Sequence, residues 1–148
     1  MGENRFFIDC HQDIAYSIRA NKREFDTNKN DYMISLESLT NSKLNIIFST
    51  IFVSHLKSKY HREEALSQIN EYEKIFKKYK NKFFKIKSKK DLNKNLGKKT
   101  GLIFLMEGAE PIKQIDDIDL FHNLGLRILS LTWNHKNRYA FGTNTNGN

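Results

Sequence analysis

The segment LNIIFSTIFV, residues 44–53, decides how this chain folds. Nearly every residue in it is apolar, and it is rich in the β-branched and aromatic side chains that favour strands. A strand with apolar residues at consecutive positions is buried on both faces, which is typical of a parallel sheet covered by helices. The segment therefore predicts an α/β protein built around a parallel sheet.

Similar apolar segments lie on both sides of residues 44–53 and alternate with helical patterns. Residues 61–79 have apolar side chains three or four positions apart, which predicts the longest helix. Gly97 and Gly125 follow two shorter helical patterns, and glycine is common just past helix ends. Strands that alternate with helices predict parallel βα units. The expected strands are residues 6–10, 44–53, 83–86, 102–106 and 126–133, and like residues 44–53 the last two are expected to be buried. The expected helices are residues 34–43, 61–79, 88–96 and 116–124. Residues 19–32 show no clear period.

The composition is that of a globular protein, with 39% hydrophobic and 28% charged residues in a chain of 148. We expect residues 1–148 to form a single domain, since no repeat or proline-rich linker divides them. The single cysteine, Cys10, excludes an internal disulfide and fits a reducing compartment. The sequence shows no signal peptide and no apolar run long enough to cross a bilayer, so we expect a cytoplasmic protein without a membrane partner.

The chain is basic, with a formal net charge of +8, and much of the excess lies between Lys74 and Lys99. Such a segment is a candidate for binding nucleic acid or an anionic membrane. Lysine dominates it, whereas arginine is the usual reader of bases and phosphates, so we interpret it as solvated surface and expect no specific nucleic-acid partner. A non-catalytic remnant or basic binding module with this lysine-rich surface is the alternative function.

Polar residues that can bind a metal follow two of the expected strands. In FFIDCHQDIA, residues 6–15, Asp9, His11 and Asp13 occupy alternate positions, so in a strand all three leave the same face. Glu107 follows residues 102–106, and active sites of parallel α/β proteins gather at the C-terminal ends of strands. His11, Asp13 and Glu107 are therefore candidate ligands for zinc or a related ion. The alternatives are a solvated loop or helix cap for the first two and a charge that marks the strand end for Glu107.

Four segments of the sequence resemble the membrane (renal) dipeptidase family. DCHQD is similar to that family's Asp-x-His-x-Asp signature, and LIFLMEGAEPI resembles its strand that ends in Glu-Gly. LFHNLGLRILSLTWNHKNRYAFG and ISLESLTNSKLNIIFSTIFV resemble two further segments, the second being a leucine-rich helix followed by a strand. The resemblance covers residues 6–142, and its order and spacing carry more weight than any single motif.

This resemblance implies a (β/α)₈ TIM-type barrel and a metallopeptidase that hydrolyses dipeptides. It implies that His11 and Asp13 bind one zinc ion and that Glu107 bridges to a second. A metal-activated hydroxide would then attack the scissile carbonyl, which the ions polarise. The family's remaining histidine ligands, catalytic aspartate and substrate-binding arginine are expected beyond Asn148, so no catalytic residue is assigned within this chain. We therefore expect an incomplete barrel, inactive by itself, that is completed by a missing C-terminal half or by a second copy in a homodimer.

The sequence departs from the family pattern at several positions. Trp133 stands where family members often have a substrate-contacting histidine, and Cys10 and Ala109 replace glycines. Trp133 and Asn134 remain candidate substrate-binding residues; the alternative is a tryptophan that closes the barrel mouth.

Other side chains are weaker candidates for a metal. His55 and His135 follow strands, whereas His61 and His122 fall on or beside helices, where we expect them at the surface. Cys10 is expected to point away from His11 as a small buried residue. We expect none of these five residues to be a native ligand.

Overall fold

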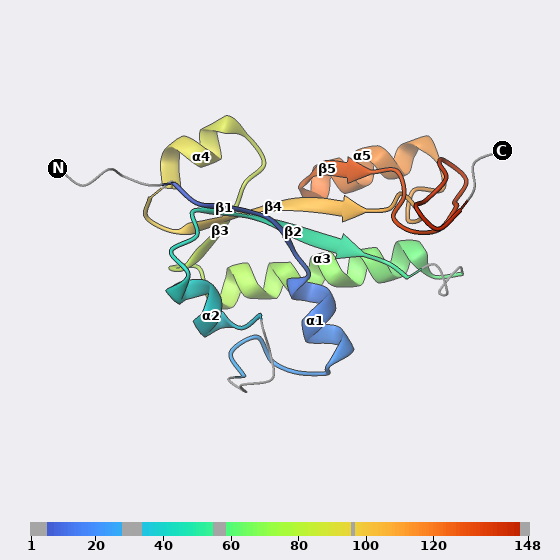
Figure 1. Ribbon diagram of the computed structural model, residues 1–148. Helices are drawn as coiled ribbons and strands as arrows, with labels where there is room; N and C mark the ends of the chain where they lie inside the picture. Colours follow the sequence, from blue (N-terminus) through green and yellow to red (C-terminus); the bar gives the residue numbers. More distant parts are fainter. Residues whose placement is uncertain (1–5, 28–33, 55–58, 96, 146–148) are drawn as a thin grey trace.

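A computed structural model describes residues 6–27, 34–54, 59–95 and 97–145 (Figure 1). It contains a five-stranded sheet in which every pairing is parallel. Strand β2 lies between β1 and β4, and both β3 and β5 pair with β4. The strands are β1 (Ile8–Gln12), β2 (Ile46–Phe52), β3 (Phe83–Lys85), β4 (Thr100–Glu107) and β5 (Leu126–Ser130).

The order of the strands confirms the predicted α/β class. Strand β3 pairs with the start of β4, at residues 100–102, and β5 pairs with its end, at residues 104–107. Apart from the short β3, the sheet therefore runs β1, β2, β4, β5 in chain order. Barrels place consecutive strands side by side in this way, whereas doubly wound sheets reverse direction at a switch point.

Among the described residues, five helices connect the strands, and four of them occur where the sequence predicts them. They are α1 (Ile14–Ala20), α2 (Leu36–Asn41), α3 (His61–Lys78), α4 (Lys89–Asn95) and α5 (Ile115–Leu124). Helix α1 was not predicted. Its buried face consists of Ile14, Ala15 and Ile18, and a pattern of three residues over two turns is too short to stand out from the polar sequence that follows.

The two faces of the sheet are covered differently. On one face, Ile47 and Ile51 of β2 and Leu102 and Phe104 of β4 belong to the main core, which also holds buried residues of α1, α3 and α5. On the other face, a smaller cluster around Ile46, Phe84 and Ile86 includes Leu92 of α4 and lies near the start of the strands. In Figure 1, α1 and α3 lie on one side of the sheet and α4 lies on the other.

Polar side chains of α3 fix this helix to β2. The Tyr72 hydroxyl is fully buried and donates to the carbonyl of Thr50 at 2.9 Å. The side chain of Gln68, also buried, exchanges two hydrogen bonds with the backbone of Phe52, the last residue of β2. These contacts hold the C-terminal end of β2 in place, where the strand approaches the candidate metal site.

Strand β5 differs from the expectation of a buried strand. Only alternate positions are covered, and Leu129 and Leu131 are exposed. The reason is that β5, like β1, pairs on one edge only within the described sheet. Both strands therefore present an open edge, and apolar side chains near each edge face solvent.

Helix α5 begins at a capping box and is tied to α3. The carboxylate of Asp117 accepts from the backbone N–H groups of Lys113 and Gln114, and it forms a 2.8 Å ion pair with Arg62 of α3. The helix ends at Gly125, whose φ of 120° suits glycine and turns the chain into β5. No helix among the described residues combines the length and the apolar composition that crossing a membrane requires.

Candidate metal centre

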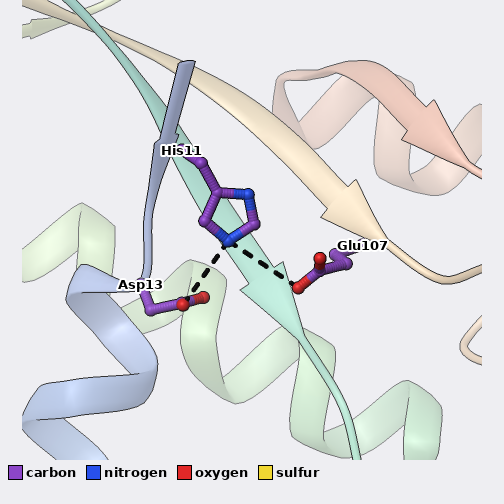
Figure 2. A group of neighbouring side chains, drawn as sticks. All are labelled: His11, Asp13 and Glu107. Atoms are coloured by element: carbon purple, nitrogen blue, oxygen red, sulfur yellow. Dashed lines mark ion pairs between the residues drawn. The ribbon is translucent and has the colours of Figure 1, made fainter. Parts of the chain in front are cut away.

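Three candidate ligands meet at the C-terminal end of the sheet (Figure 2). His11 lies near the end of β1, Asp13 is the N-cap residue of α1, and Glu107 is the last residue of β4. His11 Nε2 is 3.5 Å from Asp13 Oδ2 and 3.7 Å from Glu107 Oε2. One ligand atom from each residue lies within 4.8 Å of the other two. The prediction that these residues come close together at the strand ends is therefore confirmed.

The local backbone explains why Asp9 is not part of this group. The pairing of β1 with β2 shifts register between Asp9 and Gln12, which breaks strict alternation. Asp9 instead accepts from the backbone N–H of His11 at 2.9 Å and from the side chain of Gln12 at 2.6 Å. The Asp9 carboxylate is therefore engaged within the turn into α1 and is not a member of the group formed by His11, Asp13 and Glu107.

The electrostatics of the group favour a cation. Burial raises the pKa of Glu107, the nearby His11 lowers it, and the Asp13 carboxylate raises it further, with a net upward shift. The Asp13 Oδ1 atom is buried and accepts no hydrogen bond from the described residues. Two carboxylates that face each other, one with an unpaired buried oxygen, are stabilised when a positive ion lies between them.

The donor set fits a divalent ion. Ligand atoms of a tetrahedral zinc site lie about 2.0–2.2 Å from the metal and therefore about 3.3 Å from each other. The 3.5 and 3.7 Å separations in the protein are close to this value. Imidazole nitrogen and carboxylate oxygen also suit manganese and iron, so the donor set selects a class of metal rather than one element.

The other candidate ligands occupy varied positions. His55 lies outside the described residues. His122 is exposed on α5, as expected, whereas His61 is buried at the start of α3, so its expected surface position is wrong. Cys10 is exposed instead of buried, because β1 is an edge strand whose apolar positions face solvent.

A narrow cleft lies directly beside Glu107. Its free volume is about 10 Å³, and its walls include both predicted substrate-binding residues, Trp133 and Asn134. Trp133 packs edge-to-face on Phe52, with ring centroids 5.1 Å apart. The complete lining is Phe52, Val53, Glu107, Glu110, Trp133, Asn134 and His135.

Sequence reasoning missed Phe52 and Glu110 as cleft residues. The sequence offered a signal for Phe52, because Phe52 lies near the end of the apolar run 44–53 just as Glu107 lies at the end of its strand. In the structure the two residues pair in register across β2 and β4. No periodic pattern singles out Glu110, which lies in the turn after β4. Its position depends on contacts with a loop more than twenty residues further along the chain.

Known proteins share this arrangement of strands and helices. Dipeptidase AC, a metallopeptidase of family M19, superposes with a TM-score of 0.77 at 22% identity, over 88% of this chain and 44% of its own. A Rhodobacter sphaeroides metallopeptidase, solved with a phosphinate mimic of the dipeptide L-Ala-D-Ala, gives 0.74 at 21% identity, over 86% and 45%. The probable dipeptidase PvdM from Pseudomonas aeruginosa gives 0.81 at 14% identity, over 94% and 37%.

These likenesses show the fold, and the chain spans less than half the length of each of these three structures. A search of curated proteins finds no match. The model of the family Membrane dipeptidase (Peptidase family M19) matches residues 2–147, almost the entire sequence. This chain therefore belongs to the membrane dipeptidase family, peptidase family M19.

Proposed function

We propose that this chain forms the metal-binding first part of a zinc-dependent dipeptidase. The observation that carries the proposal is the convergence of His11, Asp13 and Glu107 in a member of a metallopeptidase family. His11 and Asp13 would hold one zinc ion, and Glu107 would bridge to a second. An ion held there acts as a Lewis acid and lowers the pKa of water.

The chain's own residues prepare this site in three ways. Asp9 fixes the backbone of His11, which sets the direction of the imidazole. The Gln68 side chain fixes Phe52 beside Glu107. The aromatic pair Phe52 and Trp133 covers one side of the cleft and limits the access of water to Glu107.

A dipeptide is the substrate that we propose. The cleft is lined by aromatic and carboxylate groups and has room for one small group, such as the amino end of a short peptide. One structural relative was solved with a mimic of L-Ala-D-Ala. The remaining metal ligands would come from further βα units that pair with the open edges of β1 and β5, in the same polypeptide or in a second copy.

The lysine-rich segment does not contribute to this site. It covers the end of α3, β3 and α4, near the start of the strands, whereas Glu107 is at the end of β4. Several of its lysines bind acceptors within the protein: Lys74 pairs with Glu71, Lys78 with Asp26 and Lys85 with Glu73. These ion pairs favour the interpretation as solvated surface.

The test is hydrolysis of a dipeptide by the product of the whole reading frame that encodes this sequence. We expect release of alanine from L-Ala-D-Ala that chelation abolishes and zinc restores. Glu107→Gln should lower kcat/KM about a hundredfold or more, because several kcal/mol of transition-state stabilisation depend on the bound ions. The matched control is Glu63→Gln, which removes the same charge from an exposed position on α3. Hydrolysis that survives chelation and Glu107→Gln would refute the proposal.

A further inference from the structure

The turn after β4 brings a second carboxylate into the cleft beside Glu107. Gly108 has a φ of 90°, and the carboxylate of Glu110 folds back over it. The positive φ favours glycine at this position, and the absence of a side chain leaves room for the Glu110 carboxylate in its present position.

Asn137 fixes this carboxylate from the opposite loop. Its side-chain nitrogen donates to Glu110 Oε1 at 3.1 Å and to the carbonyl of Leu131 at 2.7 Å. Its side-chain oxygen accepts from the backbone N–H groups of Tyr139 and Ala140. Every polar atom of the Asn137 amide group is thus engaged, and Glu110 is held by a rigid partner.

Within the part of the chain that the structure describes, no lysine, arginine or histidine forms an ion pair with Glu110. Glu110 is not a member of the group formed by His11, Asp13 and Glu107, which is the only group of three ligand residues found in the described part of the chain. A half-buried carboxylate in a cleft, with no cationic partner among residues 6–27, 34–54, 59–95 and 97–145, is suited to bind a cation from outside.

The size and walls of the cleft define that cation. Its volume of about 10 Å³ accommodates one group the size of a water molecule or an ammonium group. The faces and edges of Phe52 and Trp133 form another wall, and aromatic rings attract organic ammonium ions. A carboxylate combined with aromatic rings in a space of this size fits a primary ammonium group.

We propose that Glu110 binds the α-ammonium group of the peptide substrate and makes the site specific for peptides with a free amino end. The proposal rests on the proposed dipeptidase function and adds the residue that recognises the amino end. Because Glu107 borders the same cleft, a peptide bound through its ammonium has its first carbonyl group next to the metal-binding residues. An N-acylated peptide lacks the charge and exceeds the space.

The only tryptophan, Trp133, provides the measurement, because it lines the cleft and its fluorescence reports binding there. The metal-free full chain is titrated with Ala-Ala and with N-acetyl-Ala-Ala. We expect Ala-Ala to change the emission saturably and the acetylated peptide to bind about tenfold or more weakly, the usual contribution of a charge-assisted hydrogen bond. Glu110→Gln should abolish this preference, whereas the exposed control Glu63→Gln should retain it.

The Glu110→Gln variant keeps an oxygen that can accept from Asn137, and circular dichroism verifies its fold. The proposal is overturned if the wild-type chain binds both peptides equally well or does not bind Ala-Ala. It is also overturned if Glu110→Gln keeps the preference for Ala-Ala over N-acetyl-Ala-Ala.

A separate zinc titration distinguishes the Glu110 assignment from the proposed dipeptidase function. If zinc binds through His11 and the peptide preference is absent, the Glu110 assignment fails alone. If the preference is present and zinc does not bind, the proposed function fails and the ammonium site remains.

Discussion

At the scale of single residues, a few buried polar groups determine how precisely the strand ends are placed. The hydroxyl of Tyr72 donates to the carbonyl of Thr50 in β2 and lies 3.4 Å from the backbone N–H of Ala15 in α1. One atom therefore connects α3, β2 and the start of α1, and Asp13 is the N-cap residue of α1. Glu107 depends on the same region, because β2 pairs with β4 along its whole length.

Removing this hydroxyl tests its contribution. We expect Tyr72→Phe to lower the free energy of unfolding by about 1–2 kcal/mol, since a buried carbonyl and N–H group lose their partner while the ring is retained. The measurement is urea denaturation followed by circular dichroism. Tyr60→Phe is the control, because Tyr60 is 65% exposed and its change should be close to neutral. Equal effects of the two substitutions would contradict the assigned contacts.

At the scale of elements, the junction of α3 with α5 depends on one buried carboxylate. Burial by itself would raise the pKa of Asp117, but the N–H groups of Lys113 and Gln114 and the guanidinium of Arg62 hold it below its usual range. A folded pKa below the unfolded value of about 3.9 adds stability above that pH, and the stability is lost as the pH falls through the folded pKa.

The pH dependence of this contribution can be measured with Asp117→Asn. Near pH 6 we expect the variant to be less stable than the wild-type protein by about 1–3 kcal/mol, because the buried charge-assisted bonds are weakened. The difference should begin to shrink as the pH falls below about 4, where the unfolded chain takes up a proton, and it should be lost as the pH falls through the lower pKa of the folded carboxylate. Asp119→Asn, at an exposed position of the same helix, should show little difference at any pH. Parallel stability curves for wild-type and Asp117→Asn protein across this range would contradict the role of the charge.

A comparison of the elements shows how much of the fold and of the candidate site could be predicted from the sequence alone. Continuous apolar runs such as residues 44–53 predicted the parallel strands, and the spacing in residues 61–79 predicted α3 to within one residue. Position at strand ends was enough to select His11, Asp13 and Glu107. The divergence of Asp9 depends on a register shift, and the position of Glu110 depends on Asn137 far along the chain, so neither has a local signal.

At the scale of the whole molecule, helices cover one face of the sheet more fully than the other, and the described sheet has open edges at β1 and β5. Helices α1, α3 and α5 bury one face in the main core, while Trp133 and Leu131 remain exposed near β5 and Phe7 near β1. Open parallel edges and exposed apolar groups are the features that pairing with further βα units would remove. His11, Asp13 and Glu107 come together at one end of this sheet without such units, so the group that we propose as the first part of a metal site is assembled by the chain itself.

The most direct test of the account is therefore a zinc titration of the purified chain by calorimetry, together with X-ray absorption at the zinc edge. We predict that one zinc ion binds per chain through nitrogen and oxygen ligands. The zinc affinity should fall about tenfold or more in His11→Ala and in Glu107→Gln. The control His122→Ala, on the exposed side of α5, should leave the zinc affinity unchanged. Unchanged affinity in both His11→Ala and Glu107→Gln, or no zinc binding by the wild-type chain, would contradict the central claim that these strand ends form a metal site.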